Sequence, residues 1–187
     1  MYAIWNLTNV CPWNCSFCCM SAIGANSQNN INVLTLNEKM KVLRILADNN
    51  VKIDFSGGDP LYYPDDFSVV ETATKILSPE MIDVSMTGVD FNSSKLALIK
   101  KVGKVEISID NPPNATNKYR PKGFNSSVIL ILERIVKAGI FCSGVTTLYL
   151  ETASKDNLKA LYNLLCAKKI PKWNIFRYYL AGKGFFS

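Results

Sequence analysis

The sequence of 187 residues contains no histidine. A chain without imidazole cannot use Ser-His-Asp or Cys-His catalysis, cannot build a histidine zinc site, and lacks the usual general base of neutral pH. Any catalysis must therefore depend on cysteine, carboxylate, amine or hydroxyl groups, or on a cofactor.

Long apolar runs and a charged leader are also missing. Residues 1–10 contain no lysine or arginine, and the longest strongly apolar stretch, 128–132, ends at Glu133. That stretch is far shorter than the about 20 residues that span a bilayer. We expect no signal peptide, no contact with a membrane and a cytoplasmic location, where thiols stay reduced. The six cysteines then indicate metal or redox chemistry rather than disulfides.

The net charge of +6 is not concentrated in one segment. Lysine and arginine are scattered along the chain, and the densest short group is Lys168, Lys169 and Lys172. A phosphate-binding surface needs clustered cations, whereas scattered ones are typical of a solvated surface. The sequence therefore disfavours a nucleic-acid partner.

The length limits the fold. Eight strand–helix units would have about 23 residues each, fewer than the about 30 that such a unit occupies, so a complete eightfold barrel is excluded. Six units of about 31 residues fit, and the chain 1–187 is expected to form a single domain.

Short β-rich segments alternate with helical patterns six times. A capping box at Thr35–Glu38 starts the first helix, which carries Met40, Leu43 and Leu46 at helical spacing. This alternation predicts an α/β fold, a partial (β/α)6 barrel of parallel strands with outer helices. The expected strands are 2–8, 52–56, 81–86, 104–110, 140–148 and 173–179, and the further helices are 66–77, 94–101, 126–138 and 154–168.

The expected strands have two different faces. In 104–110, Val105, Ile107 and Ile109 alternate with Glu106, Ser108 and Asp110, and 52–56 and 82–87 alternate in the same way. The apolar set must face the helices, which predicts a polar interior that holds water or a polar ligand, because unpaired buried charges are costly. The alternative is an open sheet with one solvated face.

Four cysteines lie within nine residues, directly after the first strand. Cys11, Cys15 and Cys18 have the spacing C-x3-C-x2-C, and three thiolates can hold three irons of a [4Fe–4S] cluster while one iron stays open. The alternative, a zinc knuckle, needs a second ligand pair that the sequence does not offer. Cys19, adjacent to Cys18, is interpreted as a bystander, and Cys142 and Cys166 as small core residues.

The segment 11–18, with an aromatic residue before the third cysteine, resembles the signature of the radical S-adenosylmethionine (SAM) superfamily. The segment 56–61, Ser-Gly-Gly-Asp-Pro-Leu, resembles the Gly-Gly-Glu-Pro segment of that superfamily, with Asp59 in place of Glu. Segments 108–110 and 119–124, and a last strand followed by Gly182, extend the resemblance over the whole chain. It is greatest to the subgroup of molybdenum-cofactor and peptide-maturation enzymes, in the form of a core domain without an auxiliary-cluster extension.

The resemblance implies a cofactor set and a site. Cys11, Cys15 and Cys18 would hold a [4Fe–4S] cluster whose open iron binds the amino and carboxylate groups of SAM. Asp59 or nearby carbonyls would accept from the SAM ammonium, and the alternative is that Asp59 only orders the turn before Pro60. The other implied SAM-site residues are Gly57 and Gly58 beside the methionine moiety, Phe17 near adenine, Ser108 and Asp110 toward the ribose or substrate, and Arg120 at the SAM carboxylate.

The implied reaction is reduction of SAM to methionine and a 5′-deoxyadenosyl radical that abstracts hydrogen from a peptide or a small metabolite. It needs a reductant such as flavodoxin or ferredoxin. Three other functions stay open: a glycyl-radical activase acting on a partner protein, a non-catalytic iron–sulfur or electron-transfer module, and a zinc-dependent nucleic-acid binder.

Overall fold

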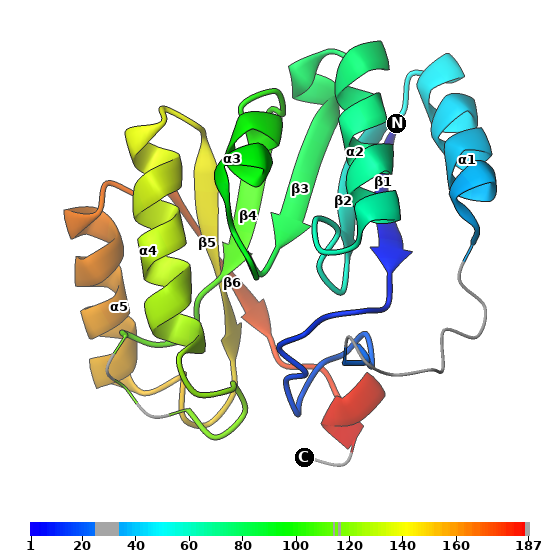
Figure 1. Cartoon of the computed structure of the whole chain (residues 1–187). Helices are drawn as coiled ribbons and strands as arrows, with labels where there is room; N and C mark the ends of the chain where they lie inside the picture. Colours follow the sequence, from blue (N-terminus) through cyan, green and yellow to red (C-terminus); the bar gives the residue numbers. More distant parts are fainter. Residues whose placement is uncertain (25–33, 114, 116, 186–187) are drawn as a thin grey trace.

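The computed structural model describes residues 1–24, 34–113, 115 and 117–185. In this part of the chain, strands and helices alternate along the sequence (Figure 1). The elements are β1 (Tyr2–Thr8), α1 (Leu36–Asp48), β2 (Lys52–Gly57), α2 (Pro64–Ile76), η1 (Pro79–Met81), β3 (Ile82–Met86), α3 (Ser93–Ile99), β4 (Lys104–Ser108), α4 (Phe124–Lys137), β5 (Cys142–Leu148), α5 (Lys155–Ala167), β6 (Lys172–Arg177) and η2 (Gly182–Phe185).

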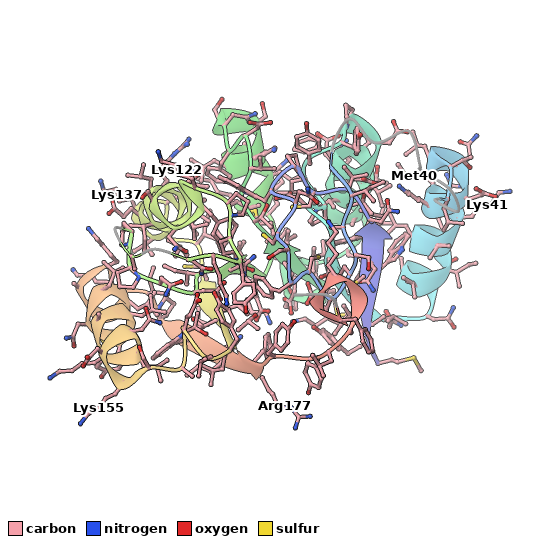
Figure 2. The ribbon with its side chains drawn as sticks, turned by 90° about the horizontal axis from the view of Figure 1, so that it is seen from below. Met40, Lys41, Lys122, Lys137, Lys155 and Arg177 are labelled. Atoms are coloured by element: carbon pink, nitrogen blue, oxygen red, sulfur yellow. The ribbon has the colours of Figure 1, made fainter. Side chains whose placement is uncertain are left out.

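The strands form one open sheet in sequence order, β1-β2-β3-β4-β5-β6, and every neighbouring pair is parallel. Viewed from the carboxyl ends of the strands, the helices form an arc around the outside of the sheet (Figure 2). This architecture confirms the predicted α/β fold of six parallel strands with outer helices. Lys41, Lys137 and Lys155 point outward from three different helices in the same view.

The first helix begins where the capping box predicts. Thr35 is the N-cap: its hydroxyl accepts from the backbone N–H of Glu38, and the Glu38 side chain accepts from the backbone N–H of Thr35. Helix α1 packs on α2, and a buried ion pair of Lys39 and Asp66 joins the two helices at 2.5 Å. Burial raises the pKa of Asp66, although its bond to Lys39 opposes that shift.

The two faces of the sheet differ as the alternation predicts. Val105, Ile107 and Ile109 have no exposed surface and join the core under the helices. Glu106 and Ser108, the alternate residues of β4, line a cavity on the concave face. Polar side chains therefore lie on the concave face of an open sheet, as the alternation predicts, and they place hydrogen-bonding groups where a ligand can reach them.

The two cysteines distant from the cluster motif have different environments. Cys142 on β5 is fully buried in the core, as expected for a small apolar residue. The same expectation for Cys166 is wrong, because this thiol is exposed on α5, whose buried residues are Leu161 and Leu165.

Among the described helices, none is both long enough and apolar enough to cross a bilayer.

Candidate functional site

A cavity of about 500 Å³ opens on the concave face at the carboxyl ends of the strands. Parallel strands bring their carboxyl ends to one edge, where α/β proteins bind ligands, and the volume lies in the range of small-molecule sites. The residues that line the cavity include Cys11, Cys15, Phe17, Cys18, Cys19, Asp54, Gly57, Gly58, Ser85, Thr87, Glu106, Ser108, Arg120 and Phe176.

The cysteine loop that follows β1 is a series of tight turns. The carbonyls of Cys11, Cys15 and Cys18 each accept from the backbone N–H three residues later, at 3.1–3.3 Å. Asn14 and Ser21 adopt left-handed backbone conformations, with φ of 47° and 49°. This winding brings three thiols from a segment of eight residues, 11–18, to the wall of one cavity.

The chain after β6 packs directly on this loop (Figure 1). The N–H of Lys183 donates to the Cys18 carbonyl at 3.0 Å, and its ammonium donates to the Asn14 side chain and to the Ala22 carbonyl. A Cβ on Gly182 would lie 2.6 Å from the Cys18 carbonyl oxygen. The contribution of Lys183 could not be predicted, since 165 positions separate it from Cys18.

Burial keeps two of the three thiols protonated in the free protein. It raises the pKa of Cys11 to about 11, and it also raises the pKa of Cys15 although the Arg120 guanidinium opposes that shift. Metal binding must displace these protons, because a thiolate is the ligand. The donor set therefore fits a metal centre whose charge compensates three thiolates.

The arrangement of donors also bears on the kind of centre. Among the described residues, no three Cys, Asp or Glu side chains converge closely enough to hold one metal ion. In an iron–sulfur cluster each thiolate binds a different iron. The three thiols line one cavity and could offer one ligand to each of three irons.

Gly57 and Gly58 lie at the cavity, but close packing within the protein also requires them. A Cβ on Gly57, whose φ is 115°, would lie 2.2 Å from the Thr8 carbonyl oxygen, and one on Gly58 would lie 2.0 Å from that of Val10. Two backbone hydrogen bonds join the same two segments: the Gly58 N–H donates to the Thr8 carbonyl at 2.8 Å, and the Asp59 N–H donates to the Val10 carbonyl at 2.9 Å. The glycines therefore fix the loop after β2 against the start of the cysteine loop.

The Asp59 carboxylate is directed into the protein. It is 1% exposed. Its Oδ2 accepts from the N–H and hydroxyl of Thr87 and from the N–H of Gly88 at 2.6–3.0 Å, and its Oδ1 accepts from the N–H of Leu61. These bonds join the loops after β2 and β3. The geometry favours the alternative in which Asp59 orders the loop, and a direct bond to the SAM ammonium stays a prediction.

Replacement of Asp59 by alanine should therefore lower the free energy of unfolding by about 2–4 kcal/mol, because two buried and two partly buried donors lose their acceptor. Asp59→Asn, which keeps one acceptor oxygen, should be less destabilised. Urea unfolding of the three proteins measures the effect. Unchanged stability of Asp59→Ala together with weaker SAM binding would instead support a direct contact with SAM.

Arg120 reaches the cysteine loop from the segment between β4 and α4. Its Nε donates to Asp110 Oδ2 at 2.5 Å, and its Nη1 lies 3.4 Å from Cys15 Sγ. The guanidinium stacks on the rings of Phe17 and Phe124, and its side chain is 9% exposed. Burial alone would lower the pKa of Arg120, but Asp110 and Cys15 raise it overall, so the cation is held beside the thiols.

Asparagine side chains fix the loop that carries Arg120. Asn117 Oδ1 accepts from the N–H groups of Tyr119 and Arg120, and its amide donates to Asn111 Oδ1. Asn111 in turn donates to Asn157 at the start of α5. No sequence pattern predicts these contacts, because single asparagines are common in exposed loops.

The remaining predicted residues lie in different layers. Ser108 lines the cavity from β4. Asp110 is fully buried behind it, where Oδ1 accepts from the N–H of Thr147 at 2.8 Å. Phe17 lines the cavity and packs against Tyr119, Tyr149 and Tyr178, with ring centroids 5.4–6.2 Å apart. The structure thus brings Ser108 and Phe17 to the cavity, whereas Asp110 lies behind it and contacts Arg120.

Comparison with known families matches residues 5–165 to the Radical SAM superfamily. GTP 3′,8-cyclase from Alkaliphilus metalliredigens is 24% identical over 170 residues, which is 85% of this chain and 50% of the cyclase. The chain thus spans about half the length of this curated relative. The family match confirms the resemblance inferred from the cysteine and glycine motifs.

Solved structures share the fold at low identity. SuiB from Streptococcus suis, bound to precursor peptide SuiA, superposes with a TM-score of 0.78 at 15% identity, over 96% of this chain and 39% of SuiB. The enzyme anSMEcpe with bound AdoMet gives a TM-score of 0.72 at 14% identity, over 95% of this chain and 49% of that protein. These likenesses establish the fold.

Proposed function

Because the chain belongs to the radical SAM superfamily, we propose that it binds a [4Fe–4S] cluster and SAM and abstracts a hydrogen atom from a peptide or a small metabolite. One observation carries this proposal. The three thiols of the cysteine loop and the Gly57–Gly58 backbone line the same cavity, so a cluster and a molecule bound against the glycines would be neighbours.

Cys11, Cys15 and Cys18 would hold the cluster. When bound, the cluster supplies the electron that cleaves SAM into methionine and a 5′-deoxyadenosyl radical, which then takes a hydrogen atom from the substrate. A one-electron donor such as flavodoxin or ferredoxin would act as the reductant. Arg120 would place a positive charge beside Cys15 and so compensate part of the charge of three thiolates.

The other predicted residues would position SAM. The backbone of Gly57 and Gly58 would lie along the methionine moiety and offer carbonyl acceptors to its ammonium. The backbone at Phe17 would lie near adenine, and Ser108 would reach the ribose or the substrate. Arg120, whose Nε is already bonded to Asp110, would offer its remaining N–H groups to the SAM carboxylate.

The proposal predicts turnover from defined components. Anaerobic reconstitution with iron and sulfide, followed by SAM and dithionite, should yield 5′-deoxyadenosine and methionine, measured by chromatography. The Cys15→Ala protein should yield neither product, because a cluster with only two thiolates is not retained. Wild-type protein that carries its cluster but produces no 5′-deoxyadenosine would contradict the proposed function.

A further inference from the structure

The inner wall of the cavity carries a carboxylate that the protein holds in place by one oxygen. Glu106 on β4 lines the cavity, and its side chain is 12% exposed. Its Oε1 accepts from Ser143 Oγ at 3.2 Å and from Asn174 Nδ2 at 2.8 Å, and Lys104 Nζ lies 3.0 Å from the same atom. Donors from β4, β5 and β6 therefore fix the orientation of this carboxylate.

The second oxygen of Glu106 is differently placed. No hydrogen bond from the described residues reaches Oε2, although each carboxylate oxygen can accept two. Since Glu106 lines the cavity, this oxygen offers a preoriented acceptor to a bound molecule.

The charges of this wall do not cancel. Lys52 and Lys104 both contact Asp83, at 3.0 and 3.3 Å. Asp54, which lines the cavity from β2, accepts from two neutral groups in the described part of the chain, the hydroxyls of Tyr2 and Ser85. Asp54 and Glu106 line the cavity, and together with Asp83 and the two lysines that neighbour them they make a group of two ammonium groups and three carboxylates, an excess of one negative charge.

The rest of the lining defines the body of the ligand. Ile4, Val145 and Phe176 contribute apolar surface to the same cavity. Arg120 is the one cationic side chain among the described lining residues, and it is paired with Asp110. A phosphate would find no unpaired cation on this wall, whereas an aliphatic chain with a cationic end would match both the apolar surface and the charge.

We propose that this wall binds an alkylammonium or alkylguanidinium group, the chemistry of a lysine or arginine side chain, with Glu106 Oε2 as its acceptor. The inference rests on the proposed function in one respect: it places this group in the cavity that SAM would share. It narrows the substrate class to molecules with a cationic alkyl chain, a class that does not include nucleoside triphosphates.

The test compares two peptides that differ only in the terminal ammonium group of one side chain. Ac-Ala-Lys-Ala-NH2 and its norleucine counterpart are titrated calorimetrically into anaerobically reconstituted protein without reductant, both with SAM and without it. The lysine peptide should bind at least tenfold more tightly. Glu106→Gln should remove that preference and leave norleucine-peptide binding and SAM affinity unchanged, and thermal unfolding of the variant measures the loss of its ion pair with Lys104 separately. Glu133→Gln, which alters a carboxylate paired with Lys168 on the outer helices, should keep the preference.

Equal binding of the two peptides, no binding of either, or a lysine preference that survives Glu106→Gln would overturn the proposal. Loss of SAM affinity in Glu106→Gln would assign the carboxylate to SAM and overturn it as well. Pentylamine, a free alkylammonium probe, identifies the source: weaker binding than the lysine peptide indicates a peptide, and equal binding a small amine. Failure of SAM to bind would count against the proposed function alone, because the peptide comparison without SAM still decides this inference.

Discussion

Replacing Cys11, Cys15 or Cys18 by alanine is expected to abolish the visible absorbance of the reconstituted protein. Each thiol lines the same cavity, and each would bind a different iron, so the loss of one leaves an incomplete ligand set. The effect should be all-or-none, with iron and acid-labile sulfide near zero after gel filtration. Absorption spectra and iron analysis of the three variants measure it.

Cys19 provides the matched control for that experiment. It directly follows Cys18 and lines the same cavity, although it is exposed where Cys11 and Cys15 are buried, so its replacement removes a neighbouring thiol without removing a predicted ligand. Cys19→Ala should keep the wild-type absorbance and iron content. Loss of the cluster in Cys19→Ala, with survival in Cys11→Ala, would show that the ligands are assigned wrongly.

Gly58→Ala is expected to have a large effect, because a Cβ at Gly58 would make the closest contact found at any of the glycines. The new Cβ would lie 2.0 Å from the Val10 carbonyl oxygen and 2.4 Å from its carbon, and backbone atoms cannot rotate away as a side chain can. Either the loop after β2 or the start of the cysteine loop must move. The free energy of unfolding should fall by about 3 kcal/mol, at the upper end of overpacking costs, and cluster retention should fall with it.

Gly24→Ala is the control, since a Cβ at that position meets no atom of the described residues within 4 Å. Its stability should differ from the wild type by less than about 0.5 kcal/mol. Urea unfolding and iron content, measured on both variants, separate a steric effect from a general intolerance of alanine. A Gly58→Ala protein as stable as Gly24→Ala would refute the close approach of the two loops.

Most of the fold follows from periodicity in the sequence. The alternation of Val105 and Ile107 with polar residues identifies both faces of β4, and the six strands separated by five helices indicate the parallel order. Cys166 shows where this reasoning fails. Helical spacing alone does not say which side of α5 faces the core, and the contacts of Leu161 and Leu165 decide it.

The site was predictable only where one motif carries its own chemistry. Cys11, Cys15 and Cys18 form such a motif, because their spacing within a single loop already indicates ligation. The partners of Asp59 are 28 and 29 positions away at Thr87 and Gly88, and pairing between loops of this separation depends on the register of β2 against β3. Long loops, such as the one that carries Arg120, have no periodic sequence pattern, so their paths could not be predicted.

The central claim is that SAM binds at the open iron of a cluster held by three cysteines in this cavity. Electron paramagnetic resonance of the dithionite-reduced, reconstituted protein tests it most directly, because a ligand that reaches an iron changes the signal of that cluster. Addition of SAM should shift the g-values of the reduced cluster in wild-type and Cys19→Ala proteins alike. A cluster whose spectrum is identical with and without saturating SAM would contradict the claim and indicate a cluster with a complete set of protein ligands.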